Sequence, residues 1–232
     1  RAPAAAREAR AEGFEHVNFD LIYGTPGESD DDLKMSVETA LDAGIDHLSA
    51  YALIVEDGTA LARRVRRGEL PMPDDDVLAD RYELLDGALS AAGLHWYEVS
   101  NWSTPGGECR HNLGYWDGGH WWGAGPGAHG YLDTTRWWNV KHPKAYAQAL
   151  AERRLPVADS EELDDAARHI EDVMLRLRLR SGLPDAVLTE AERLRAETAV
   201  TRGLLVRAAD RLVLTDRGRL LADAVIRDLL DD

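Results

Sequence analysis

Cysteine is almost absent from this sequence, since Cys109 is the only one in 232 residues. A single thiol excludes an internal disulfide and an all-cysteine metal or iron–sulfur site within one chain, and it fits a reducing compartment. No apolar run approaches the roughly 18 residues that a membrane helix needs. Residues 1–12 are rich in Ala, Arg and Glu and have no apolar signal-peptide core. These absences predict a soluble cytoplasmic protein without a transmembrane segment.

Positive charge and phenylalanine are also scarce. The formal net charge is −15 at pH 7, and such a surface repels nucleic acid and anionic membranes. Seven tryptophans stand against two phenylalanines, and all seven lie between Trp96 and Trp138. Packing alone would favour phenylalanine, which needs no hydrogen-bond partner. We therefore expect the working surface within the Trp-, His- and Gly-rich residues 95–142.

The first part of the chain has an α/β pattern. Residues 1–13 resemble a helix already under way and no start methionine precedes them, which predicts a fragment of a longer protein. The apolar run at 17–23 is typical of a buried strand, Ser29 before three aspartates marks a helix start, and residues 46–54 form the next strand. This order predicts a parallel sheet with a right-handed crossover.

Further along, helices are expected at 59–68 and 76–92 and a third strand at 96–100. Residues 101–142 show little periodicity, and a long irregular segment in a compact domain is usually functional. Regularity resumes with a helix at 143–152.

Residues 156–162 are typical of a linker, and the chain changes character beyond them. Residues 163–232 predict helices, a small hairpin at 203–215 and a closing helix, which together resemble a winged helix. The sequence therefore predicts two domains, at 1–155 and 163–232.

Asp20 lies inside the apolar strand FDLIYG, where a carboxylate is costly unless it is paired or hydrogen-bonded. It either grips a ligand at the end of a parallel strand or bonds neighbouring amides. The following loop, Gly24–Gly27, is either a backbone anion site at a helix start or an ordinary turn. Gly123–His129 resembles a dinucleotide fingerprint, but Pro126 interrupts it and no amphipathic helix follows.

The sharpest motif is HNLGYW, residues 111–116. His111 is a natural iron ligand, and Tyr115 and Trp116 are suited to flank a flat macrocycle. From the residue types alone, packing of a loop is the favoured alternative. His129 and His142 are weaker candidate ligands, and Cys109 is better explained as a small buried hydrophobe. Structural or surface roles are expected for the histidines at 16, 47 and 169.

Five segments in order carry a family resemblance. They are DLIYGTPGES, YALIVEDGTALARR, YEVSNWSTPGGECRHNLGYW, GAGPGAH and RWWNVKHP. Together they resemble the HemW family of heme chaperones, which is close to oxygen-independent coproporphyrinogen III dehydrogenase, a radical S-adenosylmethionine (SAM) enzyme. HNLGYW matches the family's HNxxYW heme-binding motif, and the resemblance covers essentially the whole chain.

The resemblance implies the C-terminal part of a partial (βα) radical-SAM barrel, followed by a small, mostly helical, winged-helix-like domain. It implies heme binding at His111, Asn112, Tyr115 and Trp116, with iron on His111, and transfer of heme to an acceptor protein of respiratory or membrane-associated type. The full-length parent would also bind SAM, through Asp20, and a [4Fe–4S] cluster. The CxxxCxxC loop that holds this cluster is missing from the chain.

Two alternatives stay open. The first is an enzyme of porphyrin biosynthesis that oxidatively decarboxylates coproporphyrinogen III, which HNxxYW disfavours. The second is a winged-helix DNA-binding protein, which rests on residues 163–232 alone. Their abundant acidic residues argue against a phosphate-binding face, so no nucleic-acid partner is expected.

Overall fold

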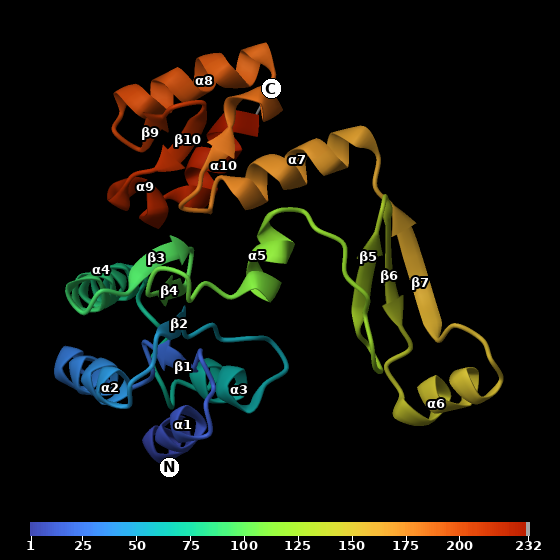
Figure 1. The fold of residues 1–232 in the computed structure, drawn as a ribbon, viewed down its shortest axis with the longest axis horizontal. Helices are drawn as coiled ribbons and strands as arrows, with labels where there is room; N and C mark the ends of the chain where they lie inside the picture. The colour runs from blue at the N-terminus through green and yellow to red at the C-terminus, as the bar shows by residue number, and fades with distance from the viewer. Residues whose placement is uncertain (231–232) are drawn as a thin grey trace. The chain divides into compact units, whose positions relative to one another are not determined.

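The computed structural model describes residues 1–230 and divides into two compact units, residues 1–108 and the chain from residue 109 onwards. Both units contain helices and sheets, so the predicted α/β class is confirmed (Figure 1). The division falls inside residues 95–142. A domain boundary between 155 and 163 therefore stays a prediction, and Asp231 and Asp232 lie outside the described residues.

Unit 1, residues 1–108, is a four-stranded sheet with helices, in the strand order β1-β2-β4-β3. Strands β1 and β2 are parallel, as the strand–helix–strand pattern predicts, whereas β4 is antiparallel to both of its neighbours. In chain order the elements are α1 (Ala2–Ala11), β1 (Asn18–Tyr23), α2 (Asp30–Asp42), β2 (His47–Ala52), α3 (Ala60–Arg66), α4 (Asp75–Ala91), β3 (His95–Glu98) and β4 (Asn101–Ser103).

The start of α2 shows how local sequence sets these bounds. Ser29 and Asp32 form a capping box, in which each side chain accepts a hydrogen bond from the other residue's backbone amide. The helix ends at Asp42, and Gly44 follows the cap residue Ala43 with a φ of 77°, a left-handed conformation that glycine adopts without strain.

The core of unit 1 lies between the sheet and its helices. Its largest fully buried side chain is Trp102, whose indole Nε1 donates to Asp86 at 2.7 Å. Strand β1 departs from the predicted buried strand, because it is an edge strand and its side chains alternate between exposed and more buried positions. Asp20 is on the exposed face, so the interpretation of a buried carboxylate is wrong.

Unit 2, from residue 109 onwards, holds two three-stranded sheets, β5-β6-β7 and β8-β10-β9, within the described residues. Its elements begin with α5 (Arg110–Trp116), β5 (His129–Leu132), β6 (Thr135–Asn139), α6 (Pro143–Ala151) and β7 (Val157–Glu162). They continue with α7 (Asp165–Arg176), β8 (Leu183–Pro184), the short 3-10 helix η1 (Asp185–Val187), α8 (Glu190–Thr201), β9 (Leu205–Ala208), β10 (Arg211–Leu214), α9 (Asp216–Leu220) and α10 (Ala222–Leu230).

Two predictions fail in this unit. Residues 101–142 are not irregular throughout, because they contain β4, α5, β5 and β6, and the longest irregular part is residues 117–128. Residues 156–162 are not a linker, because β7 pairs with β6 along its length. Every side chain of β7 is exposed, and a polar edge strand has the composition of a loop.

The β5-β6-β7 sheet has two different faces, since alternate side chains point to opposite sides. His129, Tyr131 and Arg136 share one face, and Trp137 lies on the other, directly over Gly130. A Cβ added at Gly130 would lie 2.2 Å from the Trp137 ring, so only glycine fits there.

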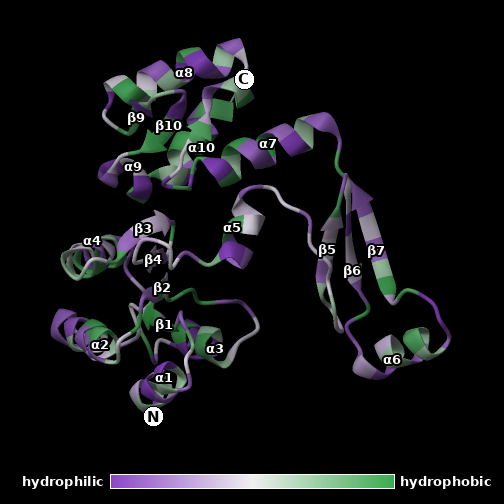
Figure 2. Cartoon of the chain, viewed as in Figure 1, coloured by the Kyte–Doolittle hydropathy of each residue, from purple (hydrophilic) through white to green (hydrophobic). Residues whose placement is uncertain are grey.

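The residues from α7 onwards form a mostly helical body around β8-β10-β9, as predicted. Thr189 and Glu192 make a second capping box at α8, and the buried Glu192 also bonds His169 at 2.7 Å. Burial alone would raise the pKa of Glu192, but the hydrogen bonds from His169 and Thr189 outweigh it and hold this pKa below its usual value. In Figure 2, hydrophobic residues gather at β10 and α10, and hydrophobic and hydrophilic residues alternate along α7.

Among residues 1–230, none of the helices is both long enough and apolar enough to cross a membrane.

Candidate functional site

The HNLGYW motif forms most of α5. This helix has seven residues, begins after Cys109 without a side-chain cap, and is followed by Gly118 at a φ of 72°. His111 and Tyr115 are four positions apart and therefore lie on one face. Asn112 and Trp116 form the neighbouring row and are half-buried, whereas His111 and Tyr115 are exposed. The helix thus presents an imidazole and a phenol to solvent.

His111 and Tyr115 are directly bonded. The His111 Nε2 and the Tyr115 Oη are 2.9 Å apart, and the two rings meet edge to face at 4.9 Å and 79°. When Nε2–H donates to the phenol, Nδ1 keeps the lone pair that a metal ion needs. A hydrogen bond on the second ring nitrogen is the usual way in which proteins orient a metal-binding histidine. In that tautomer the pair presents an oriented imidazole with a free ring nitrogen.

Aromatic contacts continue from this pair into the sheet. The Tyr115 ring meets Trp121 at 4.8 Å, and Trp121 meets Tyr131 of β5 at 5.2 Å. Trp121 and Tyr131 also exchange two backbone hydrogen bonds of 2.9 Å. The rings of Tyr115, Trp121 and Tyr131 thus form a continuous aromatic surface beside α5. Aromatic side chains of this kind stack on flat ring systems.

Asp20 belongs to unit 1. Its Oδ1 accepts a hydrogen bond of 2.8 Å from Asn18, whose own Oδ1 lies 2.6 Å from the His47 Nδ1. The His47 Nε2 in turn lies 2.8 Å from the Tyr97 hydroxyl. Burial lowers the pKa of His47, which favours the neutral ring. Asp20 is thus an exposed carboxylate held by a polar chain that runs into the sheet.

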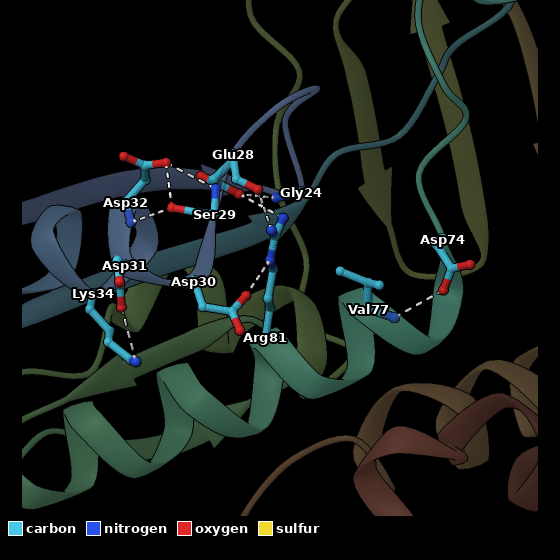
Figure 3. A network of polar contacts seen from close by, with 10 residues as sticks. All are labelled: Gly24, Glu28, Ser29, Asp30, Asp31, Asp32, Lys34, Asp74, Val77 and Arg81. Atoms are coloured by element: carbon cyan, nitrogen blue, oxygen red, sulfur yellow. Dashed lines mark hydrogen bonds and ion pairs between the residues drawn. The ribbon is translucent and has the colours of Figure 1, made fainter.

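The Gly24–Gly27 loop is an ordinary turn whose first amide is already bonded. Gly24 N–H donates to a carboxylate oxygen of Glu28 at 2.6 Å, and Arg81 of α4 pairs with the same oxygen at 3.1 Å (Figure 3). The Gly24 amide is therefore already bonded by the chain's own Glu28.

The remaining candidate residues, the other histidines and Cys109, have different surroundings. His142 caps α6 by accepting a hydrogen bond from the Lys144 amide, and His129 stacks on Trp138 at 5.8 Å without a hydrogen bond to its ring within residues 1–230. Cys109 is exposed, so its interpretation as a buried hydrophobe is wrong. The structural roles predicted for three histidines are supported by their partners, which are Asp46 for His16, Asn18 and Tyr97 for His47, and Glu192 for His169.

A [4Fe–4S] cluster does not fit the residues of this chain. Such a cluster needs three or four thiolates, and Cys109 supplies one. Within the described part of the chain, no group of three or more His, Cys, Asp or Glu side chains is placed to hold a metal ion.

We predict that these 232 residues, expressed as given, assemble no cluster and do not cleave SAM. The measurement is anaerobic reconstitution with iron and sulfide, followed by the visible spectrum and by assay for SAM cleavage. A cluster spectrum that scales with protein and persists in Cys109→Ser would contradict this expectation.

Comparison with solved structures defines the class of fold. The chain superposes on a structure described as "Coproporphyrinogen III oxidase (HemN) from Escherichia coli is a Radical SAM enzyme" with a TM-score of 0.77. The match covers 99% of this chain and 58% of that one at 18% identity. The chain therefore has the fold of part of a radical SAM protein, as predicted.

Sequence relatives define the family. The chain is 72% identical over 230 residues to the heme chaperone HemW of Mycobacterium tuberculosis H37Rv, and 33% identical over 232 residues to that of Bacillus subtilis. It belongs to the HemW family, as its motifs indicate. It spans 59% and 61% of the length of these two relatives. No protein-family profile matches the chain.

Proposed function

We propose that the protein to which this chain belongs binds heme and passes it to an acceptor protein, and that α5 is the heme-binding element. The observation that carries the proposal is the bonded His111–Tyr115 pair, exposed on one face of a helix that consists largely of the HNLGYW motif. His111 is the proposed iron ligand, with Asn112, Tyr115 and Trp116 beside the macrocycle.

Aromatic surface next to the pair supports the same assignment. A porphyrin is flat and largely apolar, so it gains most from ring stacking and burial together with one strong bond to iron. Trp121 and Tyr131 extend the aromatic surface beyond Tyr115. The histidines at 16, 47 and 169 are held by other polar side chains and are less suited to ligate iron.

SAM and a [4Fe–4S] cluster belong to the proposal only for the longer protein. Asp20 is the one residue of this chain that we assign to SAM, because its exposed carboxylate is held in place by Asn18 and is suited to accept hydrogen bonds from ribose hydroxyls. A position near Ile54 is a weaker candidate. We place the protein in the cytoplasm. The acceptor is a protein that takes up heme.

DNA binding by the C-terminal part has weaker support. Arg207, on the hairpin, is paired with both Asp185 and Glu197, and Arg202 is paired with Asp228. Arginines that already have carboxylate partners lose those partners when they bind phosphate, which weakens the attraction to DNA.

The decisive comparison is between carrying heme and decarboxylating its precursor. The full-length protein, reconstituted anaerobically with its cluster, is given SAM and coproporphyrinogen III in one reaction and heme in another. We expect saturable heme binding, release of heme to an acceptor, and no decarboxylated porphyrinogen. Decarboxylated product formed at each turnover, without saturable heme binding, would overturn the proposal in favour of the oxidase.

A further inference from the structure

The hydrogen bonds of the eight histidines divide them into two groups. Five rings have a hydrogen-bond partner, as described above. The three that have no hydrogen bond or ion pair to their nitrogens within residues 1–230 are His95, His120 and His129. An imidazole without a partner keeps a free lone pair for a metal ion when its other nitrogen carries the proton.

Two of these three histidines line one cavity in unit 2. The cavity has a volume of about 550 Å³ and is bordered by His120, His129 and Tyr131 on the sheet side, by Tyr115, and by residues of α7 that include Met174. A volume of this size lies within the range of ordinary ligand sites. Tyr115 connects the cavity to the motif, because its hydroxyl bonds His111 while its ring forms part of the wall.

The walls of the cavity combine aromatic rings with side chains of both charges, since Asp133, Glu171 and Asp172 line it together with Arg136, Arg168 and Arg176. Trp121, Tyr115 and Tyr131 provide ring surface, and the His120 ring meets Tyr131 edge to face at 5.8 Å. Arg136 lies over Tyr131 but is held by Glu171 and Glu161, so its role is to join α7 to the sheet.

Arg168 is the cation best placed to change partners. Its one ion pair within residues 1–230 is with the highly exposed Asp165, three positions away on the same helix. Exposed pairs of this kind contribute little stability. A carboxylate of a bound ligand that enters the cavity can therefore replace Asp165 at small cost.

His129 is held more firmly than His120. It lies on β5 opposite Trp138 of β6, and the two rings stack with a 29° angle between their planes. His120 lies outside the helices and strands, directly before Trp121. A ligand that is already oriented loses less freedom when it binds a metal, so His129 is the better axial ligand.

We propose that this cavity receives the heme that α5 binds, and that His129 supplies a second bond to iron on the face opposite His111, with Arg168 pairing a propionate. The inference rests on the proposed heme-binding function. The step is coordination alone: each imidazole donates one lone pair to iron, and no electron or proton is transferred.

The test is the ferric heme spectrum of the full-length protein and of three single variants: His129→Ala, His120→Ala and His95→Ala. Two imidazoles give six-coordinate, low-spin iron. We expect low-spin spectra for the wild type and for His120→Ala and His95→Ala, and a high-spin spectrum with heme still bound for His129→Ala. His129→Gln keeps a polar side chain against Trp138 and should behave like His129→Ala. His95→Ala is the matched control, because His95 is exposed, its ring has no hydrogen bond within residues 1–230, and it lies outside the cavity.

The outcomes distinguish this inference from the function on which it rests. A low-spin His129→Ala complex overturns the second ligand and leaves the heme-binding function intact. A high-spin shift in His120→Ala but not in His129→Ala also overturns it. If the wild-type protein binds no heme, both proposals are wrong.

Discussion

Replacing Arg81 with methionine is expected to lower the free energy of unfolding by about 3–5 kcal/mol, as for other buried ion pairs that lose one partner. The Arg81 side chain is 9% exposed and pairs with Glu28, which is 10% exposed, at 3.1 Å. Its Nε also pairs with Asp30 at 3.2 Å, at the start of α2 (Figure 3). Without Arg81, the buried Glu28 carboxylate keeps its bond from Gly24 but loses its countercharge.

Urea denaturation of the whole chain, followed by tryptophan fluorescence, measures the effect. The matched control is Arg66→Met, since Arg66 is 59% exposed and pairs with the exposed Asp57, so it should cost about 1 kcal/mol or less. Replacing both Arg81 and Glu28 with methionine should recover part of the lost stability, because no unpaired charge then remains. Equal losses in Arg81→Met and Arg66→Met would show that this cluster does not stabilise the loop.

Strong local signals in the sequence predict much of the fold. Ser29 before three aspartates marks α2, and the apolar runs on either side of that helix predict the parallel pair β1 and β2, which the structure confirms. The helices and strands that the sequence did not predict are short or polar. Helix α5 has seven residues and no side-chain cap, and β7 has no buried side chain, so neither shows a hydrophobic period.

The candidate site, too, has features that the sequence predicts and features that it does not. The residue types in HNLGYW are enough to single out His111 and its neighbours. Sequence does not reveal that His111 bonds Tyr115, that Glu28 fills the Gly24–Gly27 turn, or that Asp20 lies on an exposed edge strand. Each of these facts depends on helix phase or on strand order, which are settled by contacts between distant segments. The stacking of His129 on Trp138, with no hydrogen bond to the His129 ring within residues 1–230, is likewise visible only in three dimensions.

Replacing His111 with alanine in the full-length protein is expected to weaken heme binding more than any other change in α5. The change removes the proposed iron bond, whereas Trp116→Ala removes a stacking contact of about 0.5–1.5 kcal/mol. Tyr115→Phe removes only the hydrogen bond that orients His111, and losses of that kind are about 10–100-fold in metal affinity. We therefore expect a loss of more than about 100-fold for His111→Ala, with Tyr115→Phe in between and Cys109→Ser near the wild type.

The most direct measurement is a titration of the full-length protein with heme, followed at the Soret band, for the wild type and His111→Ala side by side. The wild type should saturate at one heme per chain with a shifted Soret band. His111→Ala should show neither this shift nor saturation over the same range, while its circular dichroism stays unchanged. If His111→Ala binds heme with the affinity and spectrum of the wild type, the assignment of α5 as the heme-binding element is wrong.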